Sequence, residues 1–202
     1  MHSELLFDEL NKRVLAKVIK SGLPYFQHSE KEQIGENFAE RYVNAIQYVY
    51  DQGYDAVITI GNDTPQLKTH HLLDVAKKLQ ENKVVLGPSF DGGYYLLGLH
   101  KSKFSKKLFL QLPWQTSRLL QKIKQLFKSN CTKVALINKL RDIDRIIDVK
   151  NLVDGFQRLG NSLFKILLYI LSIQKGLFSK RTHLVSIQEK NIDYNKGSPL
   201  YI

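Results

Sequence analysis

Acidic residues stand in three separate loop-like segments of this chain. Asp63 lies in Gly61-Asn62-Asp63-Thr64-Pro65, Asp91 opens the turn Asp91-Gly92-Gly93, and Asp142 and Asp144 are two positions apart. Carboxylate oxygens are the hard ligands that Mg²⁺ and Mn²⁺ prefer, and such an ion can hold a diphosphate. The pattern is therefore consistent with a site for a nucleotide-activated sugar, with Asp63, Asp142 and Asp144 as candidate metal ligands.

The same carboxylates also have structural interpretations. Asp63 precedes Thr64-Pro65 and could form an Asx turn, while Asp148 suits the first turn of a helix, where the helix dipole favours negative charge. Asp142 and Asp144 would point to one side of an extended segment, toward a metal or toward water. Both interpretations stay open at the level of sequence.

Glycine and aromatic residues accompany the acidic loops. Gly92 and Gly93 lack a Cβ, so the backbone there could pass close to a ligand or form a tight turn. Tyr94 and the tyrosine after it would place one ring on each face of a strand, where at least one of them packs in the core. Trp114 could line an acceptor pocket, although a single tryptophan more often belongs to the core.

The elements that would position these loops alternate between helices and strands. The spacing of apolar residues predicts helices over 4–20, 36–52, 70–81, 115–127 and from 148 onward, and strands over 25–28, 55–60, 83–86, 94–99 and 133–137. This alternation predicts an α/β domain with a mostly parallel sheet. Ligands of such sheets bind at the carboxyl ends of the strands, which is where the acidic loops fall.

Composition excludes several classes of protein. The chain has 202 residues, of which 43% are hydrophobic and 24% charged, values typical of a globular domain rather than a disordered chain. Cys131 is the single cysteine, which excludes an intrachain disulfide framework, and no Cys/His spacing suits zinc. No secretory signal is visible at the amino terminus, so we expect a cytoplasmic protein.

The positive charge is concentrated in the second half of the chain. Residues 1–99 carry ten basic and thirteen acidic side chains, whereas residues 100–155 carry thirteen and four, and the net charge of the whole chain is +11. This asymmetry suits an anionic substrate or an anionic membrane surface. Because no dense basic block interleaved with aromatic residues occurs, we expect no nucleic-acid partner.

The last segment, residues 161–202, differs in composition from residues 1–160. It is rich in leucine and isoleucine and then basic, so it is expected to be an appendage to the domain formed by residues 1–160. Two interpretations remain open: a helix packed on the core or on a partner, and a segment in peripheral contact with a membrane. The apolar window 163–173 is too short to span a bilayer.

Four ordered segments together resemble one bacterial family. They are Gly61 to Leu67, Leu86 to Leu99, Trp114-Gln115-Thr116, and Asp142 to Asp148, and the resemblance extends over roughly residues 5–155. The set is similar to uncharacterised glycosyltransferase-like proteins of GT-A fold, in the nucleotide-diphospho-sugar transferase superfamily. It implies a Rossmann-like three-layer α/β sandwich.

The resemblance also implies roles for individual residues. Asp63 would contact the metal and the diphosphate, Asp91 would lie at the sugar or acceptor as a catalytic residue, and Asp142 or Asp144 would complete the metal site. The remaining substrate-binding candidates in the matching motifs are Gly61, Asn62, Thr64, Pro65, Gly92, Gly93, Tyr94, Trp114 and Thr116.

The chain departs from the family pattern at its start. The family begins with a strand and a K-T-R-L-like loop that helps to hold the nucleotide, whereas this chain begins with the helix that should follow them. We therefore expect an N-terminally shortened sheet with an unpaired strand edge, for which a partner is one remedy.

Three functions fit these observations. The first is a metal-dependent glycosyltransferase that moves a sugar from a nucleotide-sugar donor to the hydroxyl of an unknown acceptor. The second is nucleotidyl transfer to a small phosphorylated substrate, because related nucleotidyltransferases share the G-x-D-x-P and D-G-G themes. The third is a catalytically inactive binding or scaffold protein, peripheral to a membrane, which the missing strand and the basic tail favour.

Overall fold

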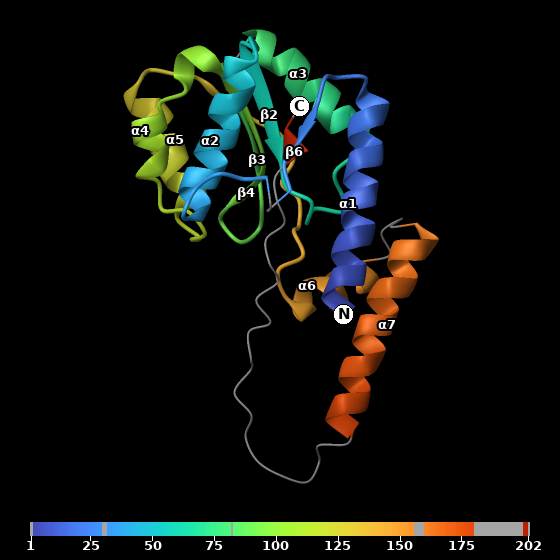
Figure 1. Ribbon diagram of the computed structural model, residues 1–202. Coiled ribbons are helices and arrows are strands. Elements are labelled where there is room, and N and C mark those ends of the chain that lie inside the picture. The colour runs from blue at the N-terminus through green and yellow to red at the C-terminus, as the bar shows by residue number, and fades with distance from the viewer. Residues whose placement is uncertain (1, 30–31, 82, 156–159, 180–199, 202) are drawn as a thin grey trace.

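The computed structural model describes residues 2–29, 32–81, 83–155, 160–179 and 200–201. Its strands are β1 (Phe26–Gln27), β2 (Ala56–Ile60), β3 (Val84–Pro88), β4 (Tyr94–His100), β5 (Val134–Leu136) and β6 (Leu200–Tyr201). They form one sheet in the order β1-β6-β2-β4-β3-β5. The sheet is the centre of the molecule and fixes where the acidic loops lie (Figure 1).

Strand direction agrees with the predicted α/β class. β1, β2, β3 and β5 point the same way, whereas β4 and β6 point the opposite way. Because β4 and β6 are inserted between strands of the other direction, most hydrogen-bonded neighbours are antiparallel. Among the described strands, β3 and β5 alone pair in parallel. The α/β class is confirmed, and the sheet is mixed.

Helices cover both faces of the sheet, as Figure 1 shows. α2 (Phe38–Asp51), α4 (Lys106–Leu110) and α5 (Leu119–Ser129) pack on one face, and α1 (His2–Ser21) and α3 (Thr69–Glu81) pack on the other. A short 3-10 turn, η1 (Lys101–Lys103), links β4 to α4. The three-layer sandwich implied by the family resemblance is therefore present.

The central strands are apolar because both of their faces are covered. All five residues of β3 and four of the five residues of β2 are buried. A strand buried on both faces needs continuous apolar residues rather than an alternating pattern. The runs that predicted these strands thus reflect their place between two helical layers.

The edge of β2 that faces away from β4 is paired in the structure. β6 lies between β1 and β2, with Thr59 opposite Tyr201 and Ile60 opposite Leu200. The other side of β6 pairs with Phe26–Gln27. The open edge expected for a shortened sheet is thus not found at β2 within the described part of the chain.

Two further helices lie beside the amino-terminal half of α1. α6 (Ile146–Asp154) and α7 (Asn161–Ser179) form an apolar cluster with it, in which Leu6, Leu10, Leu163 and Leu167 are fully buried. Of the two interpretations of residues 161–202, α7 therefore follows the first, packing on the core. In the described residues, no helix combines the length and the apolarity that crossing a membrane would need.

Candidate functional site

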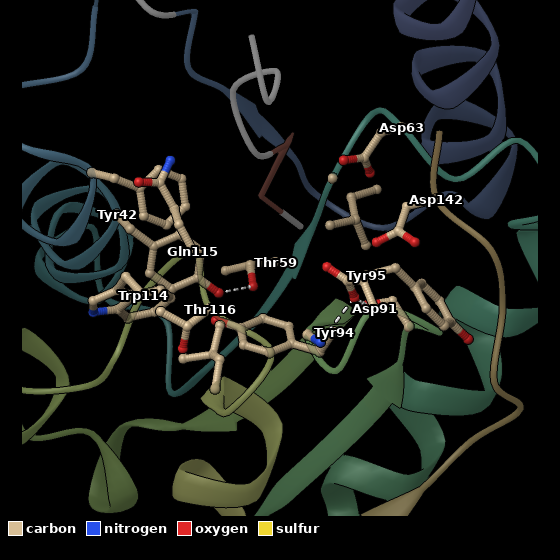
Figure 2. A pocket seen from close by; sticks show the side chains of 16 residues that line it. Tyr42, Thr59, Asp63, Asp91, Tyr94, Tyr95, Trp114, Gln115, Thr116 and Asp142 are labelled. Atoms are coloured by element: carbon tan, nitrogen blue, oxygen red, sulfur yellow. Dashed lines mark hydrogen bonds between the residues drawn. The ribbon is translucent and has the colours of Figure 1, made fainter. Parts of the chain in front are cut away.

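A pocket opens where β2 and β3 end and β4 begins. It encloses about 730 Å³ of space, part of which is open solvent at its mouth. Figure 2 shows that carboxylates gather at one end and aromatic rings at the other. Its lining residues are Phe38, Tyr42, Thr59, Ile60, Gly61, Asp63, Ser89, Asp91, Gly93, Tyr94, Tyr95, Trp114, Gln115, Thr116, Leu119 and Asp142.

The acidic end brings together carboxylates from distant parts of the chain. Asp63, Asp91 and Asp142 line the pocket. Asp91, Asp142 and Asp144 can each offer one oxygen such that the three oxygens lie within 4.8 Å of one another. Oxygens at this spacing can share one divalent cation, whose bonds to oxygen are about 2.0–2.6 Å long. The residues present therefore fit a Mg²⁺ or Mn²⁺ ion.

This geometry changes the composition of the predicted metal site. The predicted set was Asp63, Asp142 and Asp144, and the structure groups the last two with Asp91. Asp63 stays close enough for its charge to act on Asp142. Its contribution is thus a negative charge at the pocket wall beside the group of three.

The pKa of Asp142 reflects its burial and the repulsion between carboxylates in this cluster. The pKa of Asp142 is raised to about 7, first by burial and then by the charges of Asp91, Asp63 and Asp144 in that order of importance. Desolvation and like charges both disfavour an ionised carboxyl. A cation bound between these oxygens would offset the shift, because its positive charge favours the ionised carboxyl.

Backbone hydrogen bonds fix the three acidic segments relative to one another. The amide of Ile143 donates to the carbonyl of Asp63 at 2.9 Å, and the amide of Leu140 donates to the carbonyl of Pro88 at 3.1 Å. A Cβ at position 61 would lie 2.7 Å from Oδ1 of Asp63, so the loop favours glycine there. The acidic end is therefore held in place by main-chain hydrogen bonds.

Asp91 has a structural duty as well as a place in the pocket. Its Oδ1 accepts hydrogen bonds from the hydroxyl of Ser89 and, at 2.9 Å, from the amide of Gly93. These bonds close the turn between β3 and β4. The turn interpretation and the ligand interpretation of this carboxylate are thus compatible.

The opposite end of the pocket is a wall of four aromatic rings. The ring centroid of Trp114 lies 4.7 Å from that of Tyr42 and 5.5 Å from that of Phe38, and Tyr94 lies 6.4 Å from both Tyr42 and Trp114. Trp114 Nε1 donates to the carbonyl of Phe109 at 2.8 Å, which fixes the indole. Such rings offer flat apolar surfaces to a ligand.

Two buried hydroxyls support this wall from below. The hydroxyls of Tyr42 and Thr59 lie 2.5 Å apart, and Thr59 Oγ1 also donates to the carbonyl of Leu97 at 3.4 Å. Burial raises the pKa of Tyr42 to about 12, so this phenol stays protonated. The hydrogen bonds tie α2 to the central strands beneath the pocket.

The segment 114–118 is irregular, where a helix was predicted to begin. α5 starts at Leu119, and Gln115 has a φ of +58°, which is unusual for a residue with a side chain. Gln115 and Thr116 both line the pocket. Sequence reasoning did not single out Gln115, because a positive φ at glutamine has no local signature.

Several other lining residues have the sequence pattern of core residues. Phe38 and Tyr42 are spaced four apart on α2, the pattern of a core-facing stripe, yet both reach the pocket. Thr59 and Ser89 lie within or just after buried strands. Side chains that pack in the core and side chains that line the pocket have the same spacing along a helix. The sequence alone therefore does not distinguish the two roles.

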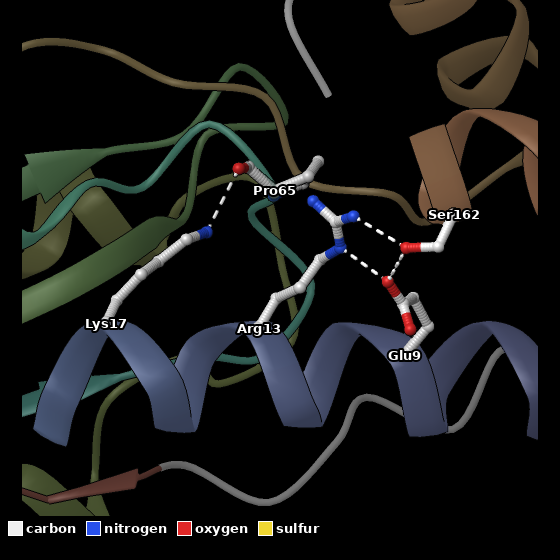
Figure 3. A network of polar contacts seen from close by, with 5 residues as sticks. All are labelled: Glu9, Arg13, Lys17, Pro65 and Ser162. Carbon is white, nitrogen blue, oxygen red and sulfur yellow. Dashed lines mark hydrogen bonds and ion pairs between the residues drawn. The ribbon is translucent and has the colours of Figure 1, made fainter. Parts of the chain in front are cut away.

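Four predicted substrate contacts do not line the pocket. Asn62 is buried and its Nδ2 donates to Oδ1 of Asn11 on α1 at 2.7 Å, and Thr64 is buried as well. The carbonyl of Pro65 accepts from Nζ of Lys17 at 3.2 Å (Figure 3). Asn62 and Pro65 therefore anchor the loop to α1.

Gly92 is the fourth predicted substrate contact that does not line the pocket. It has a φ of +92°, and a Cβ there would lie 2.3 Å from the carbonyl oxygen of Ser117. The carbonyl of Gly92 accepts from the amide of Leu120 at 3.1 Å. Its lack of a side chain therefore allows the acidic turn to contact the segment that carries Trp114, while Gly93 lines the pocket itself.

α1 connects the loop after β2 to α7. Figure 3 shows Arg13 donating to Glu9 Oε1 at 2.7 Å and to Ser162 Oγ at 2.9 Å, with Ser162 Oγ 2.5 Å from the same Glu9 oxygen. One turn farther along α1, burial lowers the pKa of Lys17 to about 8. These polar contacts fix α1 beside the acidic end.

The fold has a counterpart among solved structures. The chain is similar to the crystal structure of a "putative nucleotide-diphospho-sugar transferase" from Desulfovibrio desulfuricans G20, with 26% sequence identity and a TM-score of 0.62. The similarity covers 73% of this chain and 64% of that one, so the chain spans just under two thirds of the length of that protein. The similarity supports a shared fold.

Comparisons at the level of sequence give the family. No curated protein matches the chain. Residues 10–116, which include the loops of Asp63 and Asp91 and end at Thr116, match one bacterial family. The chain belongs to the family described as "Uncharacterized protein conserved in bacteria (DUF2064)".

Proposed function

We propose that the protein is a metal-dependent glycosyltransferase that uses a nucleotide-activated sugar. The observation that carries this proposal is the two-ended pocket, with carboxylates from three loops at one end and an aromatic wall at the other. The acidic end suits a cation that accompanies a diphosphate. The aromatic end suits a sugar ring, whose C–H faces pack against flat apolar surfaces.

Asp91, Asp142 and Asp144 would hold Mg²⁺ or Mn²⁺. When bound, such an ion supplies positive charge that stabilises a departing nucleoside diphosphate. The residues of the chain orient the reactants around it: Asp63 adds negative charge to the same wall, and the turn bonds of Asp91 keep its carboxylate in place. The reaction would break the bond between the anomeric carbon and the diphosphate and form one to an acceptor hydroxyl.

The aromatic wall would place the sugar. Trp114 is held by its hydrogen bond to Phe109 and Tyr42 by its contact with Thr59, so both rings are positioned before any ligand arrives. Groups that are positioned in advance lose little freedom on binding. Gln115 and Thr116, which border the wall, supply polar groups for sugar hydroxyls.

Product analysis tests this proposal against nucleotidyl transfer. The protein is incubated with Mn²⁺ and UDP-, GDP- or CDP-sugars, and separately with nucleoside triphosphates and a sugar 1-phosphate. Release of a nucleoside diphosphate from a nucleotide sugar is expected. Release of pyrophosphate in the second mixture alone would instead support nucleotidyl transfer, and no product in either would support a binding or scaffold role.

A matched pair of variants ties the product to the site. Asp142→Asn/Asp144→Asn should lower product formation at least about a hundredfold, because it removes two of the three candidate ligands. Asp74→Asn removes an exposed carboxylate from α3, far from the pocket lining, and should leave the rate unchanged. Equal rates in both variants would contradict the assignment of the acidic end.

A further inference from the structure

A second charged feature lies on the outer side of the acidic loops. Nζ of Lys139 lies 4.5 Å from the ring centroid of Phe90, and the guanidinium carbon of Arg141 lies 4.6 Å from the same centroid. Phe90 is 51% exposed, so this ring lies at the surface. Two cations therefore share one exposed aromatic ring.

This cationic pair is held beside the pocket by its backbone. Phe90 immediately precedes Asp91, and Arg141 immediately precedes Asp142, and both of these aspartates line the pocket. The segment of Lys139 and Arg141 is extended and runs along the turn after β3, with a bridge between Ser89 and Leu140. Neighbouring residues of an extended segment point to opposite sides, which separates Arg141 from Asp142.

The segment is fixed rather than loose. The amide of Ile137 donates to the carbonyl of Leu86 at 3.0 Å, and the amide of Arg141 donates to Oε1 of Gln66 at 2.9 Å. Tyr95 adds a hydrogen bond from its hydroxyl to the carbonyl of Asn138 at 2.8 Å. The two cations are thus presented by a main chain with little freedom to move.

The arrangement places like charges together without a counter-ion. Among the described residues, neither Lys139 nor Arg141 has a carboxylate within ion-pair distance. Each cation is attracted to the face of Phe90, but the two repel one another. An anion bound between them would convert this repulsion into two charge-assisted contacts, and an arginine beside a lysine is well suited to a phosphate group.

We propose that Lys139 and Arg141, positioned on Phe90, form a binding site for a phosphate group at the rim of the pocket. That this phosphate belongs to a substrate rests on the proposed function. Two sources share this chemistry, namely a phosphate of the nucleotide-sugar donor and a phosphate carried by the acceptor. Either would lie at the edge of the acidic end, beside the segments that carry Asp91 and Asp142.

Calorimetric titration of the full chain with inorganic phosphate, in the presence of EDTA, tests the site without any metal. Lys139→Gln/Arg141→Gln should weaken phosphate binding at least about tenfold, because both charge-assisted contacts are lost. Lys122→Gln/Lys128→Gln removes two exposed lysines of α5 and should change binding less than about twofold. Phe90→Leu, which keeps an apolar side chain but removes the aromatic face, should weaken binding about two- to threefold.

The same titration separates this proposal from the metal site. Asp142→Asn/Asp144→Asn should retain phosphate binding in EDTA, even if it loses Mn²⁺ binding. Circular dichroism checks that each variant is folded. Absence of phosphate binding by the unaltered protein, or equal binding by the Lys139/Arg141 variant and the α5 variant, would overturn the proposal, whatever the metal experiments show.

A final arm identifies the source of the phosphate. Titration is repeated with Mn²⁺ and UDP present. Competition between UDP and inorganic phosphate assigns the site to the donor, and independent binding of both assigns it to the acceptor. Both results require the Lys139/Arg141 pair, so the double variant should weaken phosphate binding in either case.

Discussion

The two ends of the pocket are built in opposite ways. At the acidic end, carboxylates are brought together by backbone hydrogen bonds such as that from Ile143 to Asp63, and their charges repel one another. At the aromatic end, Tyr42 and Trp114 are in direct contact with their neighbours and are stabilised by that contact. The acidic end therefore lowers the stability of the ligand-free protein, and the aromatic end raises it.

This difference predicts opposite signs for substitutions at the two ends. Removing a ring should destabilise the fold and weaken ligand binding together. Removing the carboxylate of Asp142 should stabilise the ligand-free fold while it removes metal binding. Sites that place like charges together for a function commonly have this cost in stability.

The largest effect is expected for Tyr42→Ala. Tyr42 is 4% exposed and its hydroxyl contacts Thr59, so truncation leaves a cavity and an unpaired hydroxyl. We expect a loss of about 3 kcal/mol in the free energy of unfolding, measured by urea denaturation. Tyr25→Ala, at a residue that is 43% exposed, is the matched control and should cost less than about 1 kcal/mol. Equal losses would show that the aromatic wall contributes no packing.

The next largest loss of stability is expected for Gly92→Ala. Gly92 lies where the acidic turn contacts the segment that carries Trp114. The added Cβ would lie 2.3 Å from the carbonyl oxygen of Ser117, at a φ of +92°. We expect a loss of about 2 kcal/mol in the free energy of unfolding. Gly53→Ala is a control with a similar φ of +94° but open space around its Cβ, and it should lose clearly less. If both variants lose the same free energy of unfolding, the close contact with Ser117 does not explain the need for glycine at position 92.

An effect of opposite sign, a gain in stability, is expected for Asp142→Asn. The folded-state pKa of about 7 lies above the ordinary value of 3.8, so the folded state binds more protons than the unfolded state between these values. The stability of the unaltered protein should therefore fall as the pH rises from about 4 to about 7, and change no further above that through this group.

The variant lacks this titratable carboxyl, so a comparison of the two proteins isolates its effect on stability. Urea denaturation of both proteins without metal should show similar stability near pH 4 and an advantage for Asp142→Asn at pH 7.5. An advantage that does not vary with pH would contradict the shifted pKa. Added Mn²⁺ should stabilise the unaltered protein and not the variant.

The acidic end was within reach of the sequence, and the aromatic end only in part, through Tyr94 and Trp114. Asp63 and Asp91 follow apolar runs that are long enough to be strands buried on both faces, and the ends of such strands lie at one edge of a sheet. That these loops are neighbours could therefore be predicted. Their roles as ligands stay predictions, and the grouping of Asp91 with Asp142 and Asp144 needed the three-dimensional arrangement.

Long-range contacts set what the sequence could not show. Phe38 and Tyr42 have the spacing of a core stripe, and only their meeting with Trp114 makes a wall. The positive φ of Gln115 follows from the path of the chain and has no local sequence signal. The pairing of β6 between β1 and β2 joins residues far apart in the chain, so local spacing gave no indication of it.

The central claim is that the pocket holds a nucleotide sugar together with a divalent cation. Thermal unfolding of the full chain with UDP-, GDP- and CDP-sugars, each with and without Mn²⁺, tests this most directly, because a ligand that binds only the folded state raises its apparent stability. We expect one nucleotide class to stabilise the protein only when Mn²⁺ is present, and Asp142→Asn/Asp144→Asn to abolish that effect. A folded protein that responds to none of these combinations would contradict the claim.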